Sequence, residues 1–393
     1  MKIRRQIFVG GVPMSLIALA SAVFLASASV AFAGWRQYGF DASHTSFNPA
    51  ETRLTRANVA SLTLAWAGET GRNPCSPPIV GGGIVFVGAH GLVHAFAVSD
   101  GSQLWLQRSC NGFGRERMSL GKHLFVTDGG PFVTGDFAAY NPIIGDSDGW
   151  CFDEGVGIAP ALDENALYLP VGDLEAETQS TGAFRWQFEP PPGSGIGGAP
   201  AIANGVVYAT GANFVFALHA ATGRQIWSRP LGRQPHLSSP SVSGNIVYVG
   251  GRGLLALSAS DGHILWSAPS AGFDVTMPAV ANGKVFVNGH GTNFGLSAFD
   301  ATTGAFLWRN QMTGESSATV SVANGVVYEI AKSGQLMMFN SDTGAFLGSV
   351  ADPDGRAFDS SFESQAAVTN GTVYVPTADS VLHNRVDAFR LPE

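Results

Sequence analysis

Four cationic or imidazole side chains recur at one spacing, each four residues after an aromatic residue: His90, Arg252, His290 and Lys332. Because the aromatic residues end short β-type runs, we expect the four side chains in loops on one rim of a ring of strands. Such a ring could bind an anionic molecule, and a histidine in it could act as a general base, because imidazole titrates near neutral pH. Polar residues stand near the equivalent places of other repeats: Asp128, Asp173, Asn213 and Asp379. The alternative is a solvated loop rim, in which the two histidines, each followed by glycine, fit tight turns.

A block of ten acidic residues occupies positions 136–177, and no Lys or Arg interrupts it. Within it, Asp146 and Asp148 precede a glycine, and carboxylates at alternate positions before a turn glycine can converge on Ca²⁺. The full calcium-loop pattern fails, because Ile144 and Gly155 stand where two of its ligands belong. A metal site at Asp146 and Asp148 and a solvated acidic loop are therefore the two interpretations.

A third group of polar residues, Asp41, His44 and Glu51, precedes the repeats described below. These residues could form a catalytic cluster, but no nucleophile can be tied to them. Hydrogen bonding that pins this part of the chain onto the domain is the favoured interpretation. No serine stands in a Gly-x-Ser-x-Gly turn between a strand and a helix, and no glycine-rich phosphate loop is present.

Repeated tryptophans indicate the elements that position these side chains. Seven of the eight tryptophans recur at intervals of 36 to 45 residues: Trp66, Trp105, Trp150, Trp186, Trp227, Trp266 and Trp308. The position one interval further holds Gly348. Most lie in the unit Ala-x5-Gly-x3-Trp, in which the glycine suits a turn with positive φ and the indole suits packing between adjacent sheets. A period near forty with turns in every repeat is typical of a β-propeller.

A second turn, usually Asn-Gly, precedes each unit and separates two β-branched or aromatic runs, which is a hairpin signal. In one repeat the expected strands are 200–203, 206–210, 214–219 and 224–229. We predict an all-β, eight-bladed propeller of four-stranded antiparallel blades over residues 62–393. Residues 62–66 have the pattern of a fourth strand, but no first three strands precede them. The last repeat, 366–391, has the opposite gap, because it lacks a fourth strand. The N-terminal strand is therefore expected to close the ring and remove an exposed sheet edge. A helical solenoid is disfavoured because no repeat shows a 3.6-residue apolar period.

Residues 1–33 have a basic start, an apolar run and a small-x-small cleavage site, which together indicate a secretory signal peptide cut after Ala33. The mature chain is expected to be exported to the periplasm or beyond, with no transmembrane segment, and Arg4-Arg5 leaves twin-arginine export open. Residues 34–61 are expected to pack on the propeller as a leading segment. The formal charge of −8 at pH 7 argues against nucleic acid as a partner. We expect a monomer.

The three cysteines allow one disulfide and one free thiol in an exported protein. Cys75 and Cys110 both fall in expected connections between blades, and we favour that pair. Cys151 directly follows a repeat tryptophan and is expected to be a buried free thiol. No CxxCH motif is present, so no covalently attached c-type haem is expected.

The Ala-x5-Gly-x3-Trp units, the Asn-Gly-Val-Val-Tyr hairpins and the stretch Trp35-Arg-Gln-Tyr-Gly-Phe-Asp resemble the quinoprotein-like (PQQ-like repeat) β-propellers. The resemblance covers nearly all of 35–391 and implies the eight-bladed fold. That family includes quinone-dependent alcohol dehydrogenases and also BamB-type scaffolds of the outer membrane, which are not catalytic. This chain lacks the adjacent cysteine pair of the former and the lipid-anchor cysteine of the latter.

Three functions remain open on the sequence. The first is a binding or scaffold module of the cell envelope, with a protein partner or small ligand at a propeller face. The alternative is a dehydrogenase that uses pyrroloquinoline quinone (PQQ) and Ca²⁺ to oxidise an alcohol or sugar, with the four rim residues as candidates. The third is a hydrolase or lyase that uses a rim histidine such as His290.

Overall fold

The computed structural model describes residues 34–71, 76–109, 116–129, 135–155, 158–232, 237–269, 276–289, 294–361, 364–378 and 384–393. The signal peptide, Cys75, Cys110, His290 and Asp379 lie outside these ranges, so the expectations that concern them stay predictions. Cys151 lies on a described strand, but its side chain is not described.

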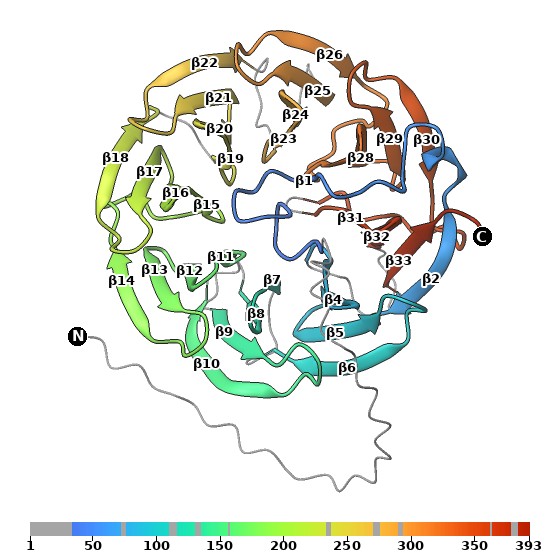
Figure 1. The fold of residues 1–393 in the computed structure, drawn as a ribbon, viewed down its shortest axis with the longest axis horizontal. Helices are drawn as coiled ribbons and strands as arrows, with labels where there is room; N and C mark the ends of the chain where they lie inside the picture. The colour runs from blue at the N-terminus through green and yellow to red at the C-terminus, as the bar shows by residue number, and fades with distance from the viewer. Residues whose placement is uncertain are drawn as a thin grey trace, which may run out of the picture.

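Eight antiparallel sheets are arranged around one axis as the blades of a propeller (Figure 1). The innermost strands of blades 1 to 8 are β3 (Ile79–Gly81), β7 (Arg117–Leu120), β11 (Ala161–Leu162), β15 (Ala201–Ala203), β19 (Ser241–Ser243), β23 (Ala279–Ala281), β27 (Ser321–Ala323) and β31 (Ala367–Thr369). The second strands are β4 (Ile84–Gly88), β8 (Leu124–Thr127), β12 (Ala166–Pro170), β16 (Val206–Thr210), β20 (Ile246–Gly250), β24 (Lys284–Gly289), β28 (Val326–Ile330) and β32 (Thr372–Pro376).

The outer half of each blade contains two further strands. The third strands are β5 (Leu92–Ala97), β9 (Gly135–Tyr140), β13 (Leu174–Thr178), β17 (Phe214–His219), β21 (Gly253–Ser258), β25 (Gly295–Asp300), β29 (Leu336–Asn340) and β33 (Arg385–Arg390). The outermost strands are β6 (Gln103–Arg108), β10 (Ser147–Gly155), β14 (Phe184–Phe188), β18 (Gln225–Pro230), β22 (Ile264–Pro269), β26 (Phe306–Asn310), β30 (Phe346–Val350) and β2 (Thr63–Glu69). The predicted fold class is confirmed.

The N-terminal strand closes the ring as the sequence predicts. β2 pairs antiparallel with β33, so the last blade combines one strand from the start of the domain with three from its end. A charged cluster lies at this seam: the Arg385 guanidinium is 2.7 Å from the Asp387 carboxylate and 2.9 Å from that of Asp352. Burial raises the pKa of Asp387 to about 7. Closure of the ring itself rests on the β2–β33 strand pairing, while the ion pairs link β33 to Asp352, which follows β30 of blade 7.

The Asn-Gly turns have the conformation that the sequence pattern indicates. At Asn204-Gly205 both residues have positive φ, 51° and 75°, and the same holds at Asn282-Gly283 with 50° and 73°. Two consecutive residues with positive φ make the type I′ turn that suits the twist of a two-residue hairpin. Predicted and observed strands of blade 4 consequently agree to within one residue at each end.

Each described repeat tryptophan joins its own blade to the next one. The Trp227 indole N–H donates to the Ala259 carbonyl of blade 5 at 2.9 Å, and Trp266 donates to Ala301 of blade 6 at 3.1 Å. The indole of Trp227 also lies against Gly262, where an added Cβ would come within 2.6 Å of the ring. The turn glycine is thus required for two reasons, its φ of 71° and the indole that covers it.

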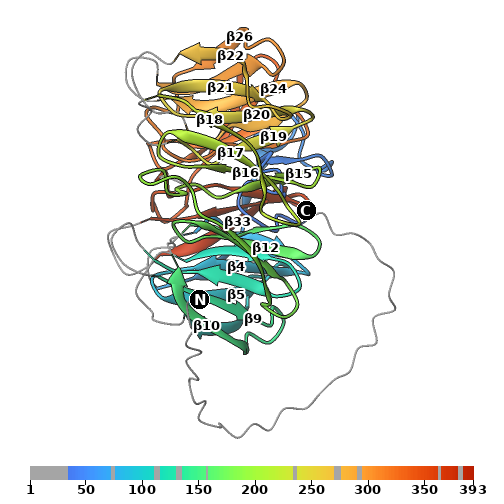
Figure 2. The ribbon, with the colours of Figure 1, turned by 90° about the vertical axis from the view of Figure 1, so that its left-hand side faces the viewer.

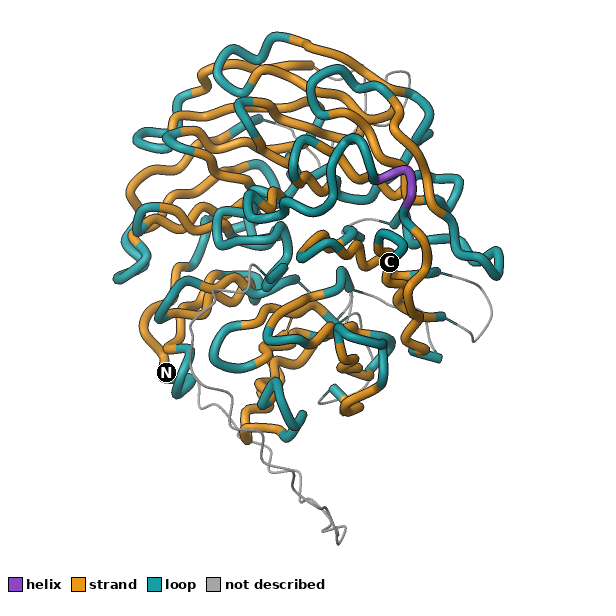
Figure 3. Tube along the Cα trace, turned by 45° about the vertical axis from the view of Figure 1, so that its right-hand side comes forward, coloured by secondary structure: helices purple, strands orange, loops and turns teal. Residues whose placement is uncertain are grey.

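Gly348, which replaces the tryptophan in blade 7, has a structural explanation. The short 3-10 helix η1 (Val59–Ser61) packs on β30, and a Cβ added at Gly348 would lie 3.0 Å from Ala60. This helix is the purple turn in Figure 3. The N-terminal segment therefore fills the place that an indole takes between the other blades.

Residues 34–61 cross one face of the ring, which we call the N-terminal face (Figures 2 and 3). The turns between first and second strands lie on this face, since Arg56 donates to the Gly325 carbonyl and Gly371 donates to the Glu51 carboxylate. β1 (Phe47–Asn48) pairs in parallel with β27, which gives blade 7 a fifth strand. None of the helices in the described ranges is long and apolar enough to cross a membrane.

Candidate functional site

The N-terminal segment contacts the innermost strand of every blade in turn. Main-chain carbonyls of the segment accept from first-strand amides of six blades at 2.6 to 2.8 Å: Val80, Leu120, Ile202, Val242, Val280 and Val322. Side chains of the segment bond to the other two blades. The Gln37 side-chain oxygen accepts from the Leu162 amide of blade 3, and the Asn48 side-chain amide donates to the Val368 carbonyl of blade 8. One short segment thus hydrogen-bonds to the innermost strand of all eight sheets.

Between its contacts with blades 3 and 4, the segment leaves the inner edge and crosses the ring. The Tyr38 hydroxyl lies 3.0 Å from the hydroxyl of Thr319, just before β27 of blade 7. The Gly39 amide donates to the side chain of Gln365, just before β31 of blade 8, at 3.2 Å. Gly39 and Phe40 turn the chain back with φ of 70° and 78°. The excursion leaves an open space above blade 3, which becomes a pocket.

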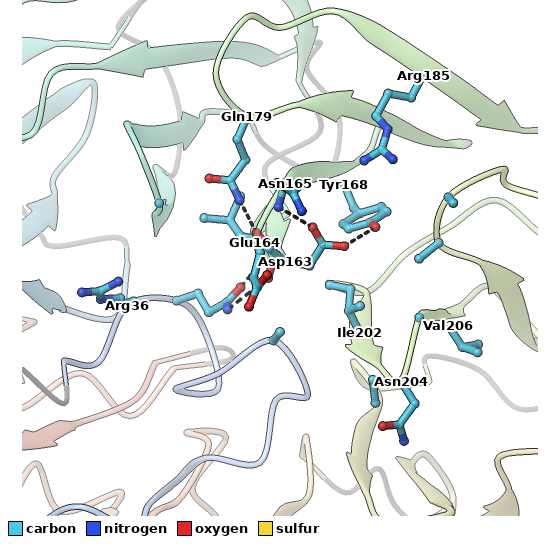
Figure 4. A pocket seen from close by; sticks show the side chains of 18 of the residues that line it. Arg36, Asp163, Glu164, Asn165, Tyr168, Gln179, Arg185, Ile202, Asn204 and Val206 are labelled. Atoms are coloured by element: carbon cyan, nitrogen blue, oxygen red, sulfur yellow. Dashed lines mark hydrogen bonds between the residues drawn. The ribbon is translucent and has the colours of Figure 1, made fainter. Parts of the chain in front are cut away.

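This blade 3 pocket has a volume of about 1020 Å³ (Figure 4). Its walls come from Arg36 and Gln37 of the N-terminal segment and from the first turns of blades 2, 3 and 4. Apolar contacts come from Leu162, Ile202 and Val206, and polar groups surround them. A concave site with an apolar floor and several convergent polar groups is the usual form of a ligand site.

Several polar groups of the pocket are already engaged within the protein. The Asp163 carboxylate accepts from the Asn165 amide at 2.9 Å, the Ala166 amide at 2.7 Å and the Tyr168 hydroxyl at 2.7 Å. Burial and this hydrogen bond to Asp163 both raise the pKa of Tyr168, which therefore stays protonated at neutral pH. Glu164 and Asn165 take the places of the usual Asn-Gly pair in this turn, and Asp163, which precedes them, accepts from the two main-chain amides of the turn, so it is not a free base.

Other polar groups of the pocket face solvent. Arg36, Lys122 and Arg185 are exposed at its rim, together with the carboxylate of Glu164 and the imidazole of His219. Arg185 extends from β14 toward the Tyr168 ring in Figure 4. None of the three cations forms an ion pair with a residue that the structure describes. The pocket therefore offers positive charge on a protein whose net charge is −8.

The predicted rim residues lie elsewhere. His90, Arg252 and Lys332 occupy turns between second and third strands, at the strand ends opposite the N-terminal face. They belong to blades 1, 5 and 7, which are not neighbours, and Lys332 lies 3.8 Å from Glu315. His90 has a φ of 43° beside Gly91 at 83°, which fits the tight-turn interpretation of that residue. His290 lies outside the described residues, and the four-residue binding rim remains an untested prediction.

The residues near equivalent positions have varied roles. Asp128 is buried and accepts from the Asp136 amide at 3.0 Å, while Asp173 accepts from Gln187. Asp146 is exposed at the start of β10, and the Asp148 side chain is not described. Within the ranges that the structure covers, no cluster of three His, Cys, Asp or Glu residues is arranged to hold a metal ion.

Asp41, His44 and Glu51 make contacts that hold the N-terminal segment in place. Asp41 accepts from Thr45, and Glu51 accepts from the Leu54 amide and from Gly371 of blade 8. His44 is buried, and burial lowers its pKa to about 4, so it is neutral at physiological pH. These contacts agree with the pinning interpretation.

The structure also contains buried acids that the sequence pattern does not reveal. Glu329 on β28 accepts from the Asn288 amide, and burial raises its pKa to about 8. Burial likewise raises the pKa of Glu116 to about 7, and its carboxylate accepts from the Gly91 amide. Both carboxyls bond to groups of a neighbouring blade, which is a structural role.

Sequence reasoning missed the blade 3 pocket, although one signal was present. The residue before each repeat tryptophan of the outer strands is apolar in most blades, as at Leu104, Ile226, Leu265 and Leu307. In blade 3 this residue is Arg185. A cation at a position that is otherwise apolar marks blade 3 as different.

Comparison with known proteins places the fold in a family. The family model described as outer membrane protein assembly factor BamB matches residues 170–276 and 268–390, which together exceed half of the chain. BamB of Escherichia coli is 37% identical over 121 residues, which cover 26% of this chain and 30% of that protein. Tetrathionate hydrolase of Acidithiobacillus ferrooxidans is 28% identical over 138 residues, 33% of this chain and 27% of that protein.

Both alignments span less than a third of the relative's own length. Among solved structures, the quinohemoprotein alcohol dehydrogenase of Comamonas testosteroni superposes with a TM-score of 0.71 at 14% identity, covering 92% of this chain and 82% of that one. This likeness concerns the fold alone. The chain belongs to the PQQ-like repeat β-propeller family that is represented by BamB.

Proposed function

We propose that this protein is a binding or scaffold module of the cell envelope, which holds a partner at the N-terminal face. The observation that carries this proposal is the blade 3 pocket, formed where the N-terminal segment departs from the inner strands. Because the segment is hydrogen-bonded to all eight blades, the pocket walls that come from the segment and from blades 2, 3 and 4 are held in fixed positions relative to one another. A preformed, rigid surface loses little conformational entropy on binding.

Two further observations support a binding role. The matching family model is described as an outer membrane protein assembly factor, and an assembly factor works by binding other proteins. In the pocket, the Asp163 carboxylate is occupied by three donors, which leaves it unsuited to proton transfer. The proposed location rests on the signal peptide expected over residues 1–33.

A photo-crosslinking amino acid at Asn204, on the pocket rim, tests the proposal in cells that export the protein. We expect a discrete crosslinked product from Asn204 and none from Ser333, an exposed residue on the opposite turns of blade 7. Ser333 is the matched control because it reports random collisions at a similarly exposed turn. Identical products from both positions, or no product from Asn204, would count against a partner at this face.

The alternative function, a PQQ-dependent dehydrogenase, is separated from this one by isothermal titration of the purified protein with PQQ, with and without Ca²⁺. We expect no saturable heat in either condition, because the cations of the blade 3 pocket lie at its rim and not around a closed cavity that could enclose a flat quinone. One-to-one binding at micromolar concentration or tighter would instead favour the dehydrogenase. It would also direct attention to the rim of His90, Arg252, His290 and Lys332.

A further inference from the structure

We infer that the blade 3 pocket recognises an acidic, extended peptide segment through Arg36, Lys122 and Arg185. This inference rests on the proposed function and gives the chemistry of the ligand at the same site. The segment would carry at least two carboxylates, separated so that they meet cations on two sides of the pocket.

The first argument is charge. The pocket lining holds three cations against two carboxylates, those of Asp163 and Glu164. The Asp163 carboxylate accepts from two main-chain amides and the Tyr168 hydroxyl, so its oxygens are held within the turn, whereas the three cations are exposed. The cations form no ion pair with the part of the chain that the structure describes. In contrast, Lys284 and Arg56, which lie elsewhere on the N-terminal face, are both paired with Asp342. Unpaired cations gathered at a concave site favour an anionic ligand.

The second argument is the arrangement of those cations. Arg36 belongs to the N-terminal segment and Lys122 to the first turn of blade 2, whereas Arg185 lies on β14, the outermost strand of blade 3. The pocket thus extends from the inner strands toward the periphery, with cations at both ends. A ligand with a single carboxylate would meet one end only.

The third argument is the space between the cations. Leu162, Ile202 and Val206 provide apolar contacts there, and the exposed side-chain amides of Asn165 and Asn204 can bond to a peptide main chain. The volume of about 1020 Å³ lies near the upper limit of roughly 1,000 Å³ for small-molecule pockets. The pocket therefore has room for several residues of an extended chain.

Fluorescence anisotropy with labelled hexaglutamate tests the inference on the purified protein. We expect saturable binding that weakens when salt rises from about 50 to about 200 mM, because exposed charges are screened. The variant R36Q/K122Q/R185Q should bind at least about tenfold more weakly, and Arg185→Gln alone about threefold. Lys332→Gln, a similarly exposed cation on the opposite face, should bind as the parent protein does. Labelled hexalysine should not bind.

Three outcomes would overturn the inference. The first is equal binding by the parent and the triple variant, and the second is an equal loss in Lys332→Gln. The third is displacement by free glutarate at concentrations equal to those of unlabelled hexaglutamate, which would identify the ligand as a small anion. If hexaglutamate fails to bind while the Asn204 crosslink persists, the acidic ligand is rejected and the proposed binding function stands. Circular dichroism of the triple variant checks that its fold is retained.

Discussion

Removing residues 34–48 is expected to lower the free energy of unfolding by at least about 5 kcal/mol. The deletion breaks six main-chain hydrogen bonds to six different blades, each worth about 0.5–1.5 kcal/mol. It also removes the fully buried side chain of Trp35, and loss of a buried tryptophan costs about 3–5 kcal/mol. Because domains are typically stable by about 5–15 kcal/mol, the shortened chain should be marginally folded or unfolded.

Urea unfolding followed by tryptophan fluorescence measures this effect. Ser43→Ala is the matched control, since it removes only the bond from the Ser43 hydroxyl to the Ile202 carbonyl and should cost about 1 kcal/mol. A synthetic peptide of residues 34–50, added to the shortened chain, should raise the urea midpoint. An unchanged midpoint after the deletion would show that the segment rests on the ring without stabilising it.

Replacing a repeat tryptophan by alanine is expected to destabilise the ring by about 3–5 kcal/mol. Trp227 is the test position, because its indole packs on Gly262, lies 6.0 Å from the Tyr208 ring and donates to the Ala259 carbonyl. Trp227→Phe keeps an aromatic ring there and loses the hydrogen bond, so it should cost about 1–2 kcal/mol. The difference between the two variants measures how much of the blade contact is packing.

Chemical denaturation of both variants gives this difference directly. If Trp227→Ala costs no more than Trp227→Phe, the indole does not join blades by packing. Matching substitutions at Trp266, which donates to Ala301, show whether the effect repeats from seam to seam.

The repeated parts of the fold were predictable because each repeat carries its own local signals. Asn204-Gly205 places a type I′ turn, Gly262 marks the turn that an indole covers, and the unpaired run 62–66 implies closure with the last blade. Each signal is a backbone requirement expressed in one or two residues. The predicted strands of blade 4 match the observed ones closely for this reason.

The candidate site was not predictable in the same way, because it depends on a segment that does not repeat. The pocket exists because the chain crosses the ring between Gln37 and Ala42, guided by partners such as Thr319 and Gln365 that are hundreds of residues away. No local pattern encodes such a path. His90, Arg252 and Lys332 lie in equivalent turns of their blades, but the spacing of residues along the chain carries no information on distances across the ring.

The path of the N-terminal segment also has a consequence for the order of folding. Its partners are separated from it by up to 326 positions, as for Gly39 and Gln365. The N-terminal segment is therefore synthesised long before blade 8, and it cannot form these contacts until blade 8 has been made. Such a high contact order predicts slow folding, with the segment docking only after the final blade is available. An incomplete chain would keep both the segment and the inner strand edges exposed, and exposed edges promote aggregation. Docking of the N-terminal segment should therefore be a late, post-translational step, and the inner strand edges should stay exposed until blade 8 has been made.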